Sequence, residues 1–408
     1  MKNRALYIPL ITSIVSAFAL VIFAAPKTEI ETKPKEGAIR VLFLGHDSEH
    51  HNSNKYYPML AKGLGSDAIY FDYVTSVEEA LGDATFLGKF DALLLYANHG
   101  TITPNQWKNL KDYVEGGGGF VPVHCASWCF GNEPAFDQLV GGRFDSHKVG
   151  TFTSKVVDPQ HPAMEGVKEF EAWDETYKHK NHNEKDRQVL MVREVAGKDD
   201  NITEPEPWTW VRTQGKGRVF YTASGHDERV WKQPAFHQLL KAGILWSVGK
   251  ERKQSYEEFI AERAPLKYEK RGDIANYENR PEPLPYQFPL KAEDSMKYTQ
   301  APVGFRLELF ASEPDIINPI GLAWDERGRL WAAETVDYPN EMTPDRVGND
   351  KIKILEDTDG DGKCDKVTVF ADGLNIPTSL TFSRGGIIVA HVPDFLFLKD
   401  TDGDDKAD

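Results

Sequence analysis

The 408-residue sequence has little of what marks several common functional classes. It contains only three cysteines, none of them in a Cys-x-x-Cys-His segment, which excludes a disulfide-stapled scaffold and a covalent haem site. It also lacks a His-Glu-x-x-His metal motif. Positive charge is scarce, since 48 Lys and Arg stand against 63 Asp and Glu, a net charge of −15. Nucleic-acid partners need a basic face, so we expect none. Neutral sugars, metal ions and cationic partners remain compatible with this charge.

The N-terminus has the pattern of an export signal. Lys2 and Arg4 precede an apolar run over residues 5–25, and Pro26 begins a polar stretch. We predict a signal peptide at residues 1–25, which places the folded part in the periplasm or otherwise outside the cytoplasm. The alternative is an uncleaved membrane anchor, because about 20 apolar residues suffice to span a bilayer.

Residues 36–250 alternate short apolar strands with helices. The strands are expected at residues 39–44, 68–74, 90–96, 120–124 and 217–222. Such a pattern indicates a parallel sheet with helices on both faces, that is, an α/β fold. In sheets of this kind, ligands bind beyond the carboxyl ends of the strands.

Histidines lie directly after four of these strands. They are His46, His99, His124 and His226, and Glu49, His50 and His51 follow shortly after His46. A single histidine in such a position is usually structural. Four at one edge of a sheet favour a shared functional pocket.

Several motifs carry a family resemblance. In chain order they are GGGFVPVHCAS, LVGGRFDSHKVG, DPQHPAMEGV, WDETYKH and PWTWVRTQGKGRVFYTASGHDERVW, spread over residues 38–249. This part of the chain resembles the ThuA-like (trehalose-utilisation) family. The resemblance implies a class I glutamine-amidotransferase-like flavodoxin fold. It also implies a link to carbohydrate catabolism, with trehalose and related disaccharides as the usual association.

The favoured hypothesis for this pocket is acid–base chemistry on a sugar or keto-sugar. His124 and His226 are the expected proton-transfer groups, and Asp174 and Glu175 are expected to orient the substrate or an imidazole ring. The residues expected to bind substrate are His46, His99, His147, Trp173, Tyr177 and Asp227, with Trp208 and Trp210 as further stacking faces.

Three other hypotheses remain open for the same pocket. Its histidines and carboxylates could hold a divalent metal ion, since imidazole is a common ligand for zinc and related ions. The domain could instead be a non-catalytic carbohydrate-binding or docking module of a sugar dehydrogenase. The comparison with amidotransferases suggests a hydrolase triad of Cys125, His226 and Glu228. This third hypothesis is the weakest, because the turn at Cys125 lacks the flanking glycines of a nucleophile elbow.

The remaining chain changes character. Residues 251–301 read as a Pro-rich linker, and residues 302–408 as part of a β-propeller. A Leu-x-Asp-Thr-Asp-Gly-Asp segment recurs after 43 residues, a spacing typical of one blade.

The region resembles the start of the sugar-dehydrogenase-type propeller in membrane-bound dehydrogenases of bacteria. About two blades fit here, whereas closed propellers have about 4–8. We therefore expect a truncated product without dehydrogenase activity, whose propeller or cytochrome partner domains are missing from this chain.

The first copy of this repeat is a candidate calcium loop. Its spaced carboxylates are Asp357, Asp359, Asp361 and Asp365, and such oxygens are hard ligands that Ca²⁺ prefers. Thr368 stands where a closing glutamate belongs. The alternative is an acidic β-turn. The sequence carries no signal for one oligomeric state over another.

Overall fold

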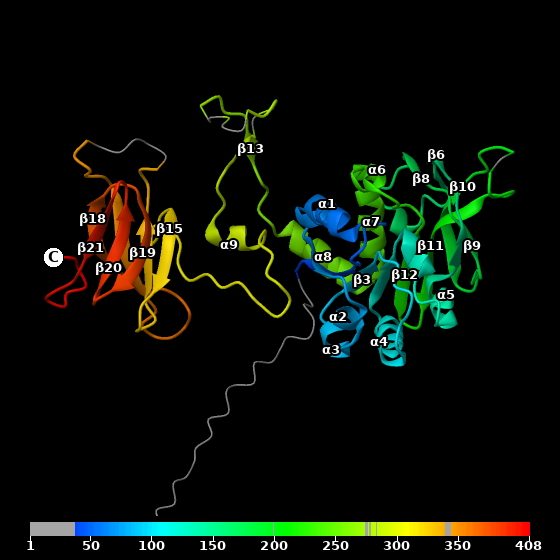
Figure 1. Cartoon of the computed structure of the whole chain (residues 1–408), viewed down its shortest axis with the longest axis horizontal. Coiled ribbons are helices and arrows are strands. Elements are labelled where there is room, and N and C mark those ends of the chain that lie inside the picture. The colour runs from blue at the N-terminus through cyan, green and yellow to red at the C-terminus, as the bar shows by residue number, and fades with distance from the viewer. Residues whose placement is uncertain (1–36, 199, 274–275, 277–278, 283, 339–343) are drawn as a thin grey trace, which may run out of the picture.

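The computed structural model describes the chain except residues 1–36, 199, 274–275, 277–278, 283 and 339–343 (Figure 1). The predicted signal peptide therefore lies outside the described residues. Among the residues that are described, no helix has both the length and the apolar character needed to cross a bilayer.

An eight-stranded sheet forms the centre of the first domain, in the order β2-β1-β3-β4-β12-β11-β10-β7. Its strands are β1 (Ile39–Leu44), β2 (Ile69–Val74), β3 (Ala92–Leu95), β4 (Gly119–Pro122), β7 (Lys155–Val156), β10 (Arg187–Arg193), β11 (Glu206–Gln214) and β12 (Gly217–Thr222). The strands from β2 to β12 pair in parallel, as expected. The expectation of a purely parallel sheet was wrong, because β11 turns directly into β12 and pairs with it antiparallel. The fold is mixed α/β.

Helices cover both faces of this sheet (Figure 1). They are α1 (Ser53–Gly65), α2 (Val77–Leu81), α3 (Ala84–Leu87), α4 (Pro104–Glu115), α5 (Pro134–Val140), α6 (Glu228–Trp231), α7 (Pro234–Ser247) and α8 (Lys250–Ala261). Every residue of β3 and β4 is buried, as two covered faces require. Short elements complete the domain: η1 (His124–Trp128), β5 (Arg143–Ser146), β6 (Val149–Thr153), η2 (Pro162–Met164), β8 (Glu171–Glu175) and β9 (Lys178–Lys180).

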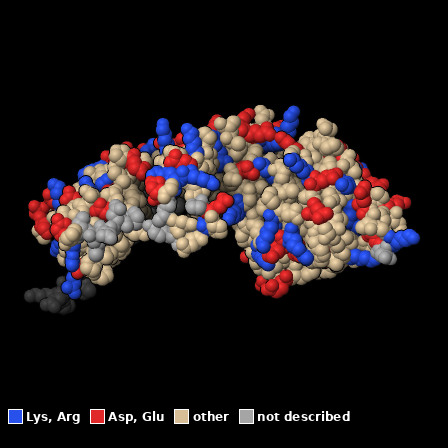
Figure 2. All heavy atoms as spheres, turned by 90° about the horizontal axis from the view of Figure 1, so that it is seen from above, with Lys and Arg blue, Asp and Glu red and all other residues tan. Residues whose placement is uncertain are grey.

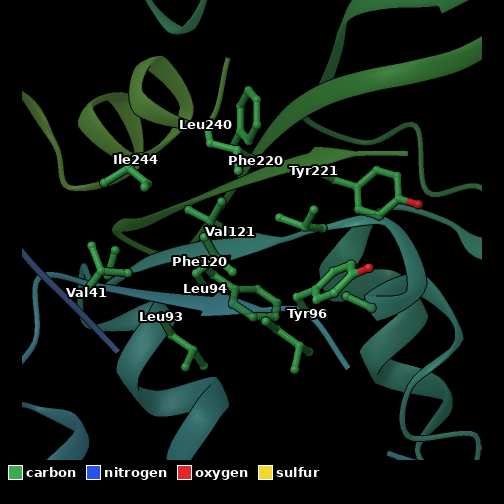
Figure 3. Packing of buried hydrophobic residues seen from close by; sticks show 14 of the residues in the cluster. Val41, Leu93, Leu94, Tyr96, Phe120, Val121, Phe220, Tyr221, Leu240 and Ile244 are labelled. Carbon is green, nitrogen blue, oxygen red and sulfur yellow. The ribbon is translucent and has the colours of Figure 1, made fainter. Parts of the chain in front are cut away.

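The core of the domain lies between the sheet and these helices. Figure 3 shows Leu240 and Ile244 of α7 next to Phe220 of β12, with Phe120 and Leu94 on the neighbouring strands. All five side chains are fully buried. This packing makes the sheet a rigid base for the loops at its carboxyl edge.

The C-terminal part forms two antiparallel meanders. The first contains β15 (Pro319–Trp324), β16 (Leu330–Glu334), β17 (Asp350–Glu356) and β18 (Lys366–Leu374), and the second contains β19 (Pro377–Ser383), β20 (Gly386–His391) and β21 (Asp394–Leu398). The connection from α8 carries β13 (Tyr268–Glu269), β14 (Tyr286–Gln287) and α9 (Ala292–Met296). Within the described residues these sheets close no ring, so the propeller stays a prediction.

Charge is mixed on the surface. On the face in Figure 2, Lys and Arg lie among Asp and Glu instead of gathering in one basic patch.

Helix α7 approaches the sheet closely enough that one position requires glycine. A Cβ on Gly243 would lie 2.5 Å from Cδ1 of Phe220, and Phe220 is buried on all sides. We expect Gly243→Ala to lower the free energy of unfolding by about 1–3 kcal/mol, measured by urea denaturation. Gly65→Ala in α1 is the matched control, since no heavy atom of a described residue outside its immediate helical surroundings lies within 4 Å of its Cβ position. Equal stability of the two variants would contradict this account of the packing.

Candidate functional site

Loops after four strands of the sheet converge on one point. His51 follows β1, Asn98 follows β3, His124 follows β4 and His226 follows β12, while Glu175 ends β8. The parallel strands place their carboxyl ends at one edge, which is why residues far apart in sequence meet here.

The Glu175 carboxylate is the centre of this convergence. Its Oε2 lies 3.1 Å from His124 Nε2 and 3.5 Å from His51 Nε2. Its Oε1 lies 3.3 Å from His226 Nδ1 and 3.5 Å from His147 Nδ1. His51 Nε2 and His124 Nε2 are 3.2 Å apart. We call His51, His124, Glu175 and His226 the His–Glu cluster, and one nitrogen or oxygen from each lies within 4.8 Å of the others.

Main-chain contacts fix the orientation of His124. Its Nδ1 lies 2.6 Å from the carbonyl oxygen of Ala223. Since a carbonyl oxygen only accepts, Nδ1 carries a proton that it donates there. The other ring nitrogen, Nε2, faces Glu175 and His51. Tyr177 stacks on the imidazole with 4.2 Å between ring centroids.

Two members of the cluster have a strained backbone. His51 has φ of 52° and His124 has φ of 49°, in the left-handed region that non-glycine residues seldom adopt. Such strain costs about 1–3 kcal/mol and concentrates at functional sites. Here the strain falls on the two cluster histidines whose rings lie closest to each other, with 4.9 Å between their centroids.

Asp174 holds the loop that carries His226. The carboxylate is buried and accepts from the backbone N–H groups of Gly225, at 3.0 Å, and His226, at 3.1 Å. It makes no contact with the pocket, so its function in this arrangement is to position His226. Sequence reasoning expected it to orient either the substrate or an imidazole ring.

The electrostatics of the cluster are strongly coupled. Burial alone would raise the pKa of Glu175, but the imidazoles of His124, His226 and His51 lower that pKa well below its usual range. Burial lowers the pKa of His51 to about 3, even though Glu175 opposes the shift. Burial also lowers the pKa of His226, yet Glu175 outweighs burial and the net pKa is raised. Glu175 is thus held as a carboxylate.

An open pocket of about 260 Å³ lies against the cluster. The residues lining it are His50, His51, Asn98, Trp128, Phe144, His147, Glu175 and Tyr177. Trp128 is 43% exposed, so its indole ring is accessible to a ligand. The pocket therefore combines an accessible aromatic ring with a floor of imidazole and carboxylate groups.

Several residues expected to bind substrate lie elsewhere. His46 accepts at Nδ1 from the backbone N–H of Asn98 and donates from Nε2 to the carbonyl of His51, so both ring nitrogens are used by main chain. His99 donates to the carbonyl of Gly45. These two histidines hold the loops of the pocket in place.

Other predicted residues form local surface or core contacts. Asp227 caps α6 and pairs with Arg229, whose guanidinium lies 3.5 Å from the centroid of the Trp173 ring. Glu228 pairs with Lys55 on the surface. Trp208 and Trp210 are fully buried and cannot provide stacking faces.

The Cys125 side chain also lies outside the pocket. It is buried in the core, and burial raises the pKa of its thiol well above the usual value. A nucleophilic cysteine needs an accessible thiolate. The geometry therefore does not support the triad with His226 and Glu228.

Sequence reasoning missed His51 as a cluster member, and Trp128, Phe144 and Asn98 as lining residues. The His50–His51 pair after β1 was a visible signal, but nothing in the sequence separated His51 from His46. Trp128 lies one helical turn beyond His124, in η1, and its exposure depends on the path of the chain after that turn.

The aspartate loop keeps part of its predicted arrangement. Asp357, Asp359 and Asp361 each have a carboxylate oxygen within 4.8 Å of the others. Asp365 instead accepts from the backbone and hydroxyl of Thr358, and Asp357 accepts from its own turn. Calcium at this loop stays a prediction.

Comparisons with known proteins assign most of this domain to a family. The family model described as Trehalose utilisation (ThuA) matches residues 40–247, and one described as a domain of unknown function (DUF7133) matches residues 291–408. A search of curated proteins finds no match.

Two solved structures are similar to the first domain. A ThuA-like protein from Bacteroides uniformis has 20% identity and a TM-score of 0.45, and covers 52% of this chain and 92% of its own. One from Parabacteroides merdae has 19% identity and the same TM-score, and covers 52% and 90%. On the strength of the family model, which matches half of its length, the chain belongs to the trehalose-utilisation (ThuA) family.

Proposed function

We propose that this protein acts on a carbohydrate, and that its pocket binds one ring of a sugar or keto-sugar over the His–Glu cluster. The observation that supports this proposal is the combination of an exposed aromatic side chain, Trp128, with imidazoles and a carboxylate in a single pocket. Membership of the trehalose-utilisation family agrees with a carbohydrate ligand.

The size of the pocket favours a single sugar ring. Pockets for drug-sized ligands are typically about 300–1,000 Å³, and this one has about 260 Å³. A second ring of a disaccharide such as trehalose would extend into solvent. We therefore expect the reacting ring to be buried and its partner ring to be held loosely.

The chemistry of the lining suits a sugar. A pyranose ring has apolar C–H faces and a polar rim, so Trp128 and Phe144 would contact a face while Glu175 and His147 bond to hydroxyl or carbonyl oxygens. His147 is also the group placed to exchange a proton with a hydroxyl, or with a carbon beside a carbonyl, whereas Glu175 stays a carboxylate and accepts hydrogen bonds. His124 and His226 are not among the lining residues, and their contacts with Glu175 hold that carboxylate in place.

The proposed setting of this activity is outside the cytoplasm. It rests on the apolar N-terminal segment alone. We also propose that the C-terminal meanders belong to a propeller of the sugar-dehydrogenase type, to which the first domain would supply or modify a sugar.

Replacing Trp128 tests the binding part of the proposal. We expect Trp128→Ala to weaken binding of trehalose or its keto derivative about tenfold, or ~1.4 kcal/mol, because a stacking face is lost. The melting temperature should stay unchanged, since the side chain is partly exposed. Isothermal titration calorimetry measures the affinity.

Trp324→Ala is the matched control, because this tryptophan is 63% exposed and lies in β15 of the C-terminal meander. Equal affinity of the Trp128→Ala and wild-type proteins would contradict the proposed pocket. Binding without turnover would favour the non-catalytic module.

The buried thiol allows a separate test of the hydrolase alternative. We expect Cys125 and Cys129 to resist iodoacetamide in the native protein, because both are buried and burial raises their pKa values. Cys364 is partly exposed and should be alkylated first, as seen by peptide mass spectrometry. Native alkylation of Cys125 faster than Cys364 would revive the cysteine nucleophile.

A further inference from the structure

We infer that the His–Glu cluster is a binding site for one divalent transition-metal ion, coordinated by His51, His124, Glu175 and His226. The site would give the pocket a positive centre to which an oxygen of the substrate binds. The role of the sugar in this inference rests on the proposed function, but the metal site itself rests on the geometry below.

The spacing of the ligand atoms matches that around such an ion. Metal–ligand bonds of about 2.0–2.1 Å place neighbouring ligand atoms about 3.3 Å apart in a tetrahedral site. Glu175 Oε2 lies 3.1 Å from His124 Nε2 and 3.5 Å from His51 Nε2, and these two nitrogens are 3.2 Å apart. His226 Nδ1 lies 3.3 Å from the other carboxylate oxygen, Oε1. One atom of each residue lies within 4.8 Å of the others, so binding one ion would draw His226 closer to the other three ligands.

Unpaired polar atoms at the cluster point to the same conclusion. His226 Nδ1 is buried, and among the described residues its polar contact is the 3.3 Å ion pair with Glu175 Oε1, which is not a well-aligned hydrogen bond. A buried nitrogen without a well-formed hydrogen bond is costly. Coordination to an ion at the centre of the cluster would remove that cost.

Asn98 provides a second unpaired atom. Its Nδ2 lies 3.1 Å from His51 Nδ1, while its Oδ1 is buried and has no hydrogen-bond partner in the described part of the chain. The two ends of an amide are almost equal in shape. A half-turn of the amide would therefore let Oδ1 accept from a protonated His51 Nδ1, which frees the lone pair of His51 Nε2 for the ion.

The other contacts of the histidines are those that metal ligands usually make. Metal-bound histidines commonly donate their second ring N–H to a carbonyl or carboxylate oxygen. His124 does so to Ala223, and His51 would do so to Asn98. His46 anchors the main chain of His51, and Asp174 anchors that of His226.

The ligand set selects the class of ion. Imidazole suits zinc, iron, cobalt, nickel and copper, whereas calcium and magnesium prefer oxygen. Three neutral imidazoles and one carboxylate leave a net charge of +1 on a bound divalent ion. Because His51 and Glu175 also line the pocket, a fifth coordination position, to which a four-coordinate ion can expand, would face the substrate. There the ion would polarise a carbonyl or a hydroxyl group.

The test is metal binding by the full chain without sugar. Protein stripped with a chelator is dialysed against Zn²⁺ or Co²⁺ and analysed by mass spectrometry for metal content, and the Co²⁺ form is also examined by visible absorption. We expect about one ion per chain with high affinity, together with Co²⁺ bands typical of nitrogen ligation. Zn²⁺ at about 100 times its dissociation constant should raise the melting temperature by about 5–10 °C.

Two variants assign the ion to this cluster. We expect Glu175→Gln and His51→Ala each to lower the affinity at least tenfold. His161→Asn should bind as the wild type does, because this histidine caps η2 through its side chain and asparagine can replace it there. Circular dichroism checks that each variant folds. An ion that stays bound in both cluster variants would lie elsewhere, for example at the aspartate loops, and would overturn the inference.

Failure of this inference and failure of the proposed function give different results. If no ion binds but trehalose or its keto derivative binds in a Trp128-dependent way, the metal site is wrong and the sugar pocket stands. If the ion binds and no sugar does, the metal site stands and the proposed ligand is wrong.

Discussion

The buried carboxylate of Glu175 is the group on which the arrangement of this site depends. It is 4% exposed, and a carboxylate removed from water is costly unless positive or hydrogen-donating groups surround it. Four imidazoles do so, and they come from four separate segments of the chain. Each of those segments must therefore reach the same point for the domain to be stable.

The fold meets this demand by its topology and by local anchors. Parallel strands bring the loops of His51, His124 and His226 to one edge of the sheet. The last adjustments are made by main-chain contacts, such as that of Asp174 with the backbone of His226 and the left-handed conformation of His124. Stability and a reactive geometry are thus produced by the same interactions, and removing Glu175 would leave several imidazoles without a partner.

The sequence predicted the strands and the edge at which they end, because buried parallel strands are continuous apolar runs and ligand sites follow them. It also predicted that His124, Glu175 and His226 belong to the site. It could not separate His51 from His46, since both follow β1 and only the path of the loop decides which ring faces inward. The antiparallel β11 and the exposure of Trp128 likewise depend on tertiary packing, not on local pattern.

The central claim is that a sugar ring binds over the His–Glu cluster. A crystal structure of the full chain with trehalose or its keto derivative tests it most directly. The account predicts one ring stacked on Trp128, with its oxygens directed at Glu175 and the neighbouring histidines. A sugar bound away from this pocket, or a pocket that stays empty at saturating ligand, would contradict it.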